Sequence, residues 1–307
     1  MKSFCRLLLI VCSLPIGYAS ATDKLELQRA AENVYAIVGE LDNRTPENLG
    51  NNATFGFVVT AEGVVLIDVG ATYQGAQRIH TVIKQVTDKP IKVVINTGGQ
   101  DHRWLGNEYF KKLGAKIIAQ KFAVEDQKAR ERDQFMMLNN LAGAKALEGT
   151  NAVYADETFD KETKFILGGI AFELHHTAHA HTQGDSFVWL PKERIVFSGD
   201  IIYVERMAVI LDVSKSSTWL QAFEAIAALD PKTIVPGHGH VTSLAQATAD
   251  TYDYVKYLRE GVATFMKQGG NAADIGKVDQ ARYSYLKNYE LARGRNALQV
   301  YTELEWE

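Results

Sequence analysis

Cysteine, proline and long apolar runs are all scarce in this sequence. Only two of its 307 residues are cysteines, Cys5 and Cys12, and both stand close to the amino terminus. A mature chain that begins after them has no disulfide, no thiolate metal ligand and no cysteine nucleophile. No stretch reaches the roughly 18 apolar residues that cross a bilayer, so we expect no membrane domain.

The amino terminus has the pattern of a secretion signal. Lys2 and Arg6 precede an apolar run at 7–17, and three small residues end at Ala21. A basic start, a short apolar segment and a small-residue cleavage site are typical of a cleavable signal peptide. We therefore predict a signal peptide at 1–21, cleavage after Ala21, and a periplasmic or secreted protein.

Neither sign of charge dominates the sequence. The 33 Lys and Arg residues against 37 Asp and Glu give a formal net charge of -4, which argues against nucleic acid as a partner. A hydrophobic content of 46% supplies enough apolar surface for a sizeable core. No linker, low-complexity tract or short repeat divides the chain, so we expect residues 22–307 to form a single domain.

Apolar periodicity predicts strands and helices in both halves of the mature chain. The expected strands are 33–38, 55–60, 64–68, 92–95, 115–119, 164–167, 170–175, 186–190, 194–197 and 232–235. The expected helices are 74–86, 104–113, 122–147, 217–229, 244–266 and 272–304, with breaks at Gly269-Gly270 and Gly294. Two halves that each mix strands with helices predict the α/β (α+β) class, with two sheets packed face to face and helices outside.

The stretch INTGGQDHRWLGN, from Ile95 to Asn107, carries the densest chemistry in the sequence. A β-branched run ends there, two glycines permit a tight loop, and four polar residues follow before a helical pattern begins. Polar side chains at the carboxyl end of a strand indicate a functional site.

Histidines and carboxylates gather at four such predicted strand ends, and seven of the eight histidines fall in or beside them. The exception is His80, in a predicted surface helix, for which we expect no role. Imidazole and carboxylate ligands suit zinc and similar divalent metals, and a catalytic zinc takes about three protein ligands and one open position. The four segments are 100–102, 175–181, Asp200 and 238–240.

Five short motifs stand in an order that resembles the metallo-β-lactamase superfamily across nearly the whole mature chain. They are Asp68-Val69-Gly70, 96–107, 180–185, Ser198-Gly199-Asp200 and 236–239. The resemblance implies an αββα sandwich with a metal site at one edge of its two sheets. By this likeness His181 matches a first-site ligand, Asp200 the bridging carboxylate and His238 a second-site ligand. Residues 296–305 are similar to the terminal helix of periplasmic members that hydrolyse small substrates, which implies a C-terminal helical extension of the domain.

The departure from the family lies in the loop that begins at Thr97. The family pattern is Thr-His-x-His-x-Asp-His, and an ungapped comparison puts Gly98 and Gln100 at the first two histidines, His102 at the aspartate and Arg103 at the last histidine. A one-residue slip instead keeps Asp101-His102 as the Asp-His pair, so that Asp101, His102, Asp200 and His238 rebuild the second site alone. Both registers remove the first two histidines, so we expect at most one tightly held metal or an altered site.

Two residues of this loop are candidates for catalysis. If Arg103 points inward, its fixed charge could occupy the region of the missing ion and hold an anionic substrate group or an oxyanion. The alternative is an arginine on the exposed side of the first helical turn. Asp101 could orient a water molecule or transfer its proton.

A second set of residues is expected around the site rather than on the metal. Asp68 would orient a ligand or loop, and Tyr203 and Arg206 could line a pocket. Beside them we place three further polar side chains, Gln100, His179 and His240.

The sequence thus favours a metal-dependent hydrolase that acts on an ester, thioester, amide or lactam of a small-molecule substrate. The expected cofactor is zinc, as one ion, with another divalent metal as the alternative. A second hypothesis is a catalytically degenerate member that serves as a binding or accessory protein of a periplasmic redox or cofactor system. A protein partner would fit that second hypothesis, although no motif indicates one.

Overall fold

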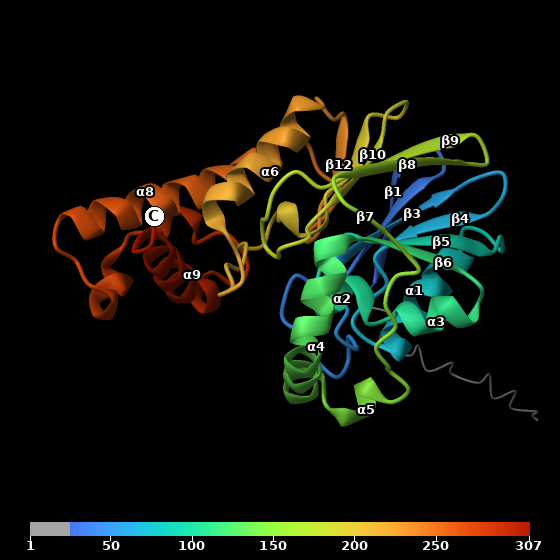
Figure 1. Cartoon of the computed structure of the whole chain (residues 1–307), viewed down its shortest axis with the longest axis horizontal. Coiled ribbons are helices and arrows are strands. Elements are labelled where there is room, and N and C mark those ends of the chain that lie inside the picture. The colour runs from blue at the N-terminus through green and yellow to red at the C-terminus, as the bar shows by residue number, and fades with distance from the viewer. Residues whose placement is uncertain (1–24) are drawn as a thin grey trace, which may run out of the picture.

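The computed structural model describes residues 25–307 (Figure 1). The predicted signal peptide lies outside these residues. No helix among the described residues is both long and apolar enough to cross a membrane.

The first sheet has seven strands in sequence order, β1-β2-β3-β4-β5-β6-β7. Neighbours from β1 to β4 pair antiparallel, and neighbours from β4 to β7 pair parallel. The bounds are β1 Glu26–Ala31, β2 Val34–Val38, β3 Thr54–Val59, β4 Val64–Ile67, β5 Ile91–Asn96, β6 Lys116–Gln120 and β7 Glu157–Phe159.

The second sheet has five strands in the order β12-β11-β10-β9-β8. All its pairs are antiparallel except β11 with β12, which is parallel. The bounds are β8 Glu162–Leu167, β9 Ile170–His175, β10 Phe187–Leu190, β11 Ile195–Phe197 and β12 Thr233–Val235.

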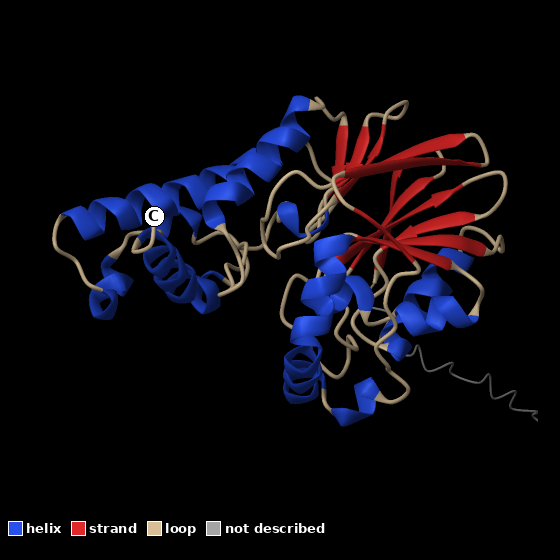
Figure 2. Cartoon of the chain, in the orientation of Figure 1, coloured by secondary structure: helices blue, strands red, loops and turns tan. Residues whose placement is uncertain are grey.

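Helices pack on the outer face of the first sheet and against the β12 side of the second (Figure 2). Their bounds are α1 Tyr73–Lys84, α2 Asp101–Trp104, α3 Asn107–Lys112, α4 Lys121–Ala142, α5 Ala144–Leu147, α6 Ser216–Ala228, α7 Leu244–Ala247, α8 Asp253–Lys267 and α9 Tyr289–Leu304. Short 3-10 turns occupy Gly199–Ile201, Ala272–Lys277 and Ala281–Tyr283, and a π-helical turn, Thr248–Tyr252, joins α7 to α8.

Three apolar clusters hold these layers together. The cluster between the sheets joins residues such as Val58 and Ile95 of the first sheet to Phe172 and Phe197 of the second. The sheets approach closely at Gly56, where an added Cβ would lie 2.2 Å from the Phe197 ring. One outer cluster packs α1 and α3 on the first sheet, and another packs α6, α8 and α9 beside the second. The predicted class, two mixed sheets flanked by helices, is confirmed.

The prediction failed for the two edge strands of the first sheet and for the segment after residue 271. β1 and β7 were missed because their side chains are mostly exposed or half-buried and carry little apolar alternation. The segment predicted as helix from 272 begins instead with two 3-10 turns, and α9 runs unbroken through Gly294. A glycine inside a helix weakens it by about 1 kcal/mol without ending it, and packing of α9 on α8 outweighs that cost.

Candidate functional site

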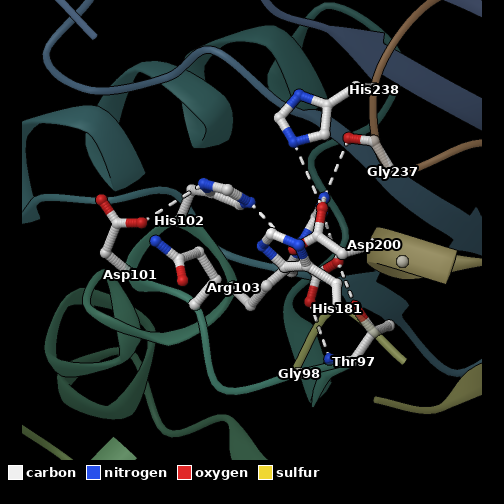
Figure 3. Close-up of polar contacts among 12 residues, drawn as sticks. Thr97, Gly98, Asp101, His102, Arg103, His181, Asp200, Gly237 and His238 are labelled. Atoms are coloured by element: carbon white, nitrogen blue, oxygen red, sulfur yellow. Dashed lines mark hydrogen bonds and ion pairs between the residues drawn. The ribbon is translucent and has the colours of Figure 1, made fainter. Parts of the chain in front are cut away.

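The site lies at one edge of the sandwich, where loops after strands of both sheets meet (Figure 3). α2 follows β5 and carries His102 and Arg103, Asp200 lies in the 3-10 turn after β11, and His238 follows β12. The parallel pairing of β11 with β12 brings the last two side by side. All four side chains are buried.

Two histidines flank one carboxylate in this site. His102 Nε2 lies 3.2 Å from Asp200 Oδ2, and His238 Nε2 lies 3.2 Å from Asp200 Oδ1. One ligand atom from each of the three residues falls within 4.8 Å of the others. The predicted ligands His102, Asp200 and His238 are therefore brought together, and a donor set of two imidazoles and a carboxylate suits zinc.

The hydrogen bonds of His238 leave an acceptor facing an acceptor. Its Nδ1 lies 2.8 Å from the Asn52 carbonyl and 3.2 Å from Arg206 Nη1, whose two N–H groups already donate to the carbonyls of Asp42 and Asn52. We therefore assign Nδ1 as the donor to Asn52, and the neutral ring then presents the Nε2 lone pair to Asp200 Oδ1. The pKa of His238 lies well below its ordinary value, mainly because the ring is buried. The ring is therefore neutral at neutral pH. A cation between Nε2 and Oδ1 would satisfy both atoms, and on this observation the residues fit a metal ion.

His102 fits the ion less directly. Its Nδ1 lies 2.8 Å from Arg44 Nη2, which can only donate, so Nδ1 accepts and Nε2 carries the proton that points at Asp200. Binding an ion through Nε2 requires the loss of that proton. The carboxylate of Asp101, 3.4 Å from Nδ1, could then accept a proton placed on Nδ1.

His181 faces the same space from the other side but is not part of the three-residue group. Its Nδ1 donates to the Val209 carbonyl at 2.9 Å, and its Nε2 has no hydrogen-bond partner among the described residues. Burial lowers the pKa of His181 to about 4, so the ring is neutral at pH 7 and Nε2 is an acceptor. His181, a predicted ligand, thus turns a free acceptor nitrogen toward the site, but it lies too far from His102, Asp200 and His238 to join their cluster.

Arg103 points inward, and its guanidinium lies between Asp68 and Asp200. Nη1 donates to Asp68 Oδ2 at 2.8 Å and to the Thr54 carbonyl. Nη2 donates to Asp200 Oδ1 at 2.7 Å and to the Gly237 carbonyl, and Nε donates to Asp200 Oδ2. These bonds use all five N–H groups of an arginine. The hypothesis that Arg103 holds a substrate anion is therefore wrong, although its charge does lie beside the carboxylate that the family uses to bridge two metal ions.

The surroundings of Asp101 do not favour the proton transfer predicted for it, and its catalytic role stays a prediction. Arg44 holds its carboxylate from two directions, with Nε 2.6 Å from Oδ2 and Nη2 against Oδ1, and Asp101 is fully buried. The positive charge of Arg44 holds the pKa of Asp101 far below its usual range despite burial. A carboxylate so strongly paired is a poor acceptor for a proton from water.

Asp185 lies where a side chain at position 98, the first of the family's metal-binding histidines, would begin. A Cβ added at Gly98 would lie 2.6 Å from Asp185 Oδ1, so a histidine does not fit there as the backbone stands. Asp185 is fixed by Thr182, whose N and Oγ1 lie 2.7 and 2.6 Å from its two oxygens. Gln100 accepts from Arg130 Nη1 at 3.2 Å. His102 and Arg103 both contact Asp200, whereas Asp101 is not one of the three clustered ligands. This arrangement agrees with the ungapped register.

The remaining predicted residues divide between the site and the surface. Asp68 accepts from Thr97 N and Oγ1, both at 2.8 Å, and so fixes the loop as well as Arg103. Tyr203 stacks on His238 with ring centroids 4.4 Å apart. His179 and His240 do not line the cavity, which corrects their predicted placement: His179 contacts the Val213 carbonyl and His240 pairs with glutamates on the surface.

A cavity of about 190 Å³ opens over His102 and His238. Sequence reasoning missed Arg44 and the contribution of α9, because a single arginine in a polar loop and a helix remote in sequence give no signal of where they pack. The lining residues are Asn43, Arg44, Gln100, His102, Met137, Leu141, His181, Tyr203, Arg206, Val209, Leu211, His238, Asn288, Leu291, Ala292 and Arg295.

The layers and the histidine-carboxylate edge define a metallohydrolase-type αββα sandwich. A family model described as the metallo-beta-lactamase superfamily matches residues 50–238, and the chain belongs to this superfamily. Membership suggests a metal-dependent hydrolase, and the structure contributes a partial histidine and aspartate cluster. α7, α8 and α9 follow the matched segment.

Individual relatives are distant. The metallo-beta-lactamase type 2 of Elizabethkingia meningoseptica is 25% identical over 190 residues, which cover 61% of this chain and 66% of that protein. A metallo-beta-lactamase from Pontibacter korlensis superposes with a TM-score of 0.58 at 22% identity, covering 73% of this chain and 95% of the other. The metallo-beta-lactamase IND-7 gives 0.58 at 18% identity, covering 74% and 96%. The two structures share the fold with this chain.

Proposed function

We propose that this protein is a periplasmic, zinc-dependent hydrolase that uses a single ion to cleave an ester, thioester, amide or lactam of a small molecule. His102, Asp200 and His238 would hold the ion. The supporting observation is the buried Nε2 of His238, which faces Asp200 Oδ1 with no proton to share. The predicted signal peptide supports the periplasmic location.

A divalent ion held there would polarise the substrate carbonyl and lower the pKa of a bound water from about 15.7 to about 7. The protein supplies the rest of the chemistry. Tyr203 lines the cavity, and its hydroxyl has no hydrogen-bond partner in the described part of the chain. Burial raises the pKa of Tyr203 well above its usual value, so the hydroxyl stays a donor for a developing oxyanion. His181 Nε2 is a neutral acceptor across the cavity.

The test is the metal content of the mature protein, purified without added metal and again after zinc is supplied. We expect about one equivalent, absent from a His238→Ala variant and retained by His240→Ala, which changes an exposed histidine outside the cavity. Circular dichroism would confirm that both variants fold. Metal-free wild-type protein after zinc addition would remove the proposal.

One observation favours the second candidate, a non-catalytic binding or accessory protein. Three buried carboxylates, Asp68, Asp101 and Asp200, are matched by three buried guanidiniums, those of Arg44, Arg103 and Arg206. Burial raises the pKa of Asp68, but donation from Thr97 and Arg103 favours its charged form. If the neighbouring buried Asp185 keeps its proton, the site is then electrically balanced without an ion. Metal-free, folded protein with no hydrolytic activity would favour this candidate.

A further inference from the structure

Arg44, in the loop between β2 and β3, contacts two neighbouring side chains of α2. Its Nε lies 2.6 Å from Asp101 Oδ2, and its Nη2 contacts Asp101 Oδ1 and lies 2.8 Å from His102 Nδ1. A guanidinium that binds a carboxylate side-on through Nε and Nη2 keeps one more N–H on Nη2. His102 Nδ1 takes that N–H, so one nitrogen of Arg44 joins the carboxylate to the imidazole. All three side chains are buried.

The contact with Arg44 decides which nitrogen of His102 carries the proton. A guanidinium has no acceptor, so Nδ1 is bare and the proton of the neutral ring is on Nε2, which lies 3.2 Å from Asp200 Oδ2. His238 holds the opposite tautomer, with its proton on Nδ1 and a bare Nε2 facing Asp200. Of the two histidines in the cluster, only His238 therefore presents a free lone pair beside the carboxylate.

Asp101 is the acceptor that would reverse the tautomer of His102. Its Oδ1 lies 3.4 Å from His102 Nδ1, and a carboxylate that accepts the proton of one ring nitrogen is a common partner of a metal-binding histidine. Arg44 excludes this arrangement, because it occupies both oxygens of Asp101 and turns a donor toward Nδ1. The proton can move to Nδ1, and Nε2 can become bare, only after Arg44 Nη2 has left the imidazole.

The loop that carries Arg44 is tied to the segment that leads into α9. Lys287 Nζ pairs with the Asp42 carboxylate at 2.9 Å, and Asn288 Nδ2 donates to the Leu41 carbonyl at 3.2 Å. These four residues and Arg44 itself all lie outside residues 50–238, which the family model matches. The contact of Arg44 with α2 is therefore a feature of this chain that the family pattern does not specify.

We propose that Arg44 is a positioning residue that holds His102 in the tautomer unable to bind a metal ion through Nε2, and that an ion enters only when the loop withdraws Arg44. Asp101 then accepts from His102 Nδ1, and Nε2 is bare beside Asp200. The ring loses the proton on Nε2 and gains one on Nδ1, so its charge does not change. As a statement about metal entry the proposal rests on the hydrolase function; as a statement about the tautomer of His102 it does not.

The first test is the tautomer of His102 in the metal-free mature protein, by long-range proton–nitrogen NMR on isotope-labelled histidine. The nitrogen shifts separate protonated from bare ring nitrogens, and the spectrum of a His102→Gln variant assigns the signals. We expect a protonated Nε2 and a bare Nδ1 in wild-type protein, and the reverse in Arg44→Met. Arg295→Met is the matched control, because it removes another arginine that lines the cavity, and it should keep the wild-type tautomer.

The second test is zinc affinity, measured by competition with a chromophoric chelator. Arg44→Met should bind zinc about 10–100-fold more tightly than wild type, the usual range for the hydrogen-bond partners of metal ligands. Adding Asp101→Asn to Arg44→Met should remove that gain, because a neutral amide is a weaker acceptor for Nδ1–H. Arg295→Met should change the affinity far less, which separates the tautomer from the loss of one positive charge near the site.

The outcomes separate this proposal from the hydrolase function. A bare Nε2, or protons on both nitrogens, in wild-type His102 overturns the proposal without any variant, so a misfolded Arg44→Met does not leave it open. An unchanged tautomer or an unchanged zinc affinity in folded Arg44→Met also overturns it. If none of these proteins binds zinc, the hydrolase is refuted, and the expected change of tautomer would still support Arg44 as the residue that sets it.

Discussion

Arg103 explains how a site that lost its first two histidines remains ordered. In the ungapped register it stands where the family has a metal-binding histidine, and its guanidinium contacts Asp200 directly. Arg103 donates hydrogen bonds to both Asp68 and Asp200, and its single positive charge offsets one of their two negative charges without any metal ion. It cannot activate water as a metal does, because its protons stay bound at neutral pH. An arginine in place of the family's histidine therefore keeps a positive charge beside the buried carboxylates, but it does not supply a ligand for a metal ion.

Replacing Arg103 by alanine should destabilise the fold strongly. The variant leaves two carboxylates buried without their partner, and breaking such a pair costs about 3–5 kcal/mol. Urea unfolding, followed by circular dichroism, measures the change. Arg132→Ala, which removes an exposed arginine, should stay within about 0.5 kcal/mol of wild type. A loss below about 1 kcal/mol for Arg103→Ala would mean that another group neutralises the carboxylates.

At the scale of elements, the loop at 39–53 is clamped onto the short helix α2 through Arg44 and Asp101. Both side chains are buried, and the pair is separated by 57 positions in sequence. α2 has only four residues and no side-chain N-cap bond. Its position therefore depends on such tertiary contacts rather than on helix propensity.

The clamp can be measured by a double-mutant cycle on Arg44→Gln and Asp101→Asn. Each single change leaves a buried charge unpaired and should cost about 3 kcal/mol or more, whereas the double variant replaces both charges by amides. We expect the double variant to be at least 1 kcal/mol more stable than the sum of the single effects, a coupling typical of contacting residues. Additive effects in urea unfolding would show that the pair does not act as a unit.

Sequence patterns predicted the central elements and the ligand cluster but not what surrounds them. The strands near the core alternate or run apolar, so β3, β5 and β9 were placed within about a residue or two. His102, Asp200 and His238 could be found because each follows a strand end. The pairing of Arg44 with Asp101, the filling of the Gly98 space by Asp185, and the packing of α9 are tertiary events between remote residues, and no local pattern encodes them.

At the scale of the whole molecule, the αββα layers bury several charged groups at one edge. The family match ends at residue 238, yet α9, one of the C-terminal helices drawn to the left of the sheets in Figure 1, supplies part of the cavity wall. The sandwich thus provides the charged base of the site and the extension provides its mouth. Whether the buried charges balance without a cation depends on the protonation state of Asp185.

Asp185 makes stability depend on pH in a defined direction. Burial, aided by the nearby Asp200, raises the pKa of Asp185 to about 8 in the folded chain, against 3.8 for the ordinary side chain. Between these values the folded state keeps a proton that the unfolded state has released. The stabilising contribution is therefore complete below about pH 4 and is lost as pH rises toward 8, by at most about 1.4 kcal/mol per pH unit.

Asp185→Asn removes this proton equilibrium and keeps a side chain of the same shape. We expect the variant to gain stability relative to wild type as pH rises from 4 to 8, in urea unfolding at each pH. Groups that titrate in both proteins cancel in the difference. A flat difference for Asp185→Asn would mean that Asp185 is ionised throughout. The buried site would then carry one uncompensated negative charge, and that charge would favour a bound cation over the metal-free candidate.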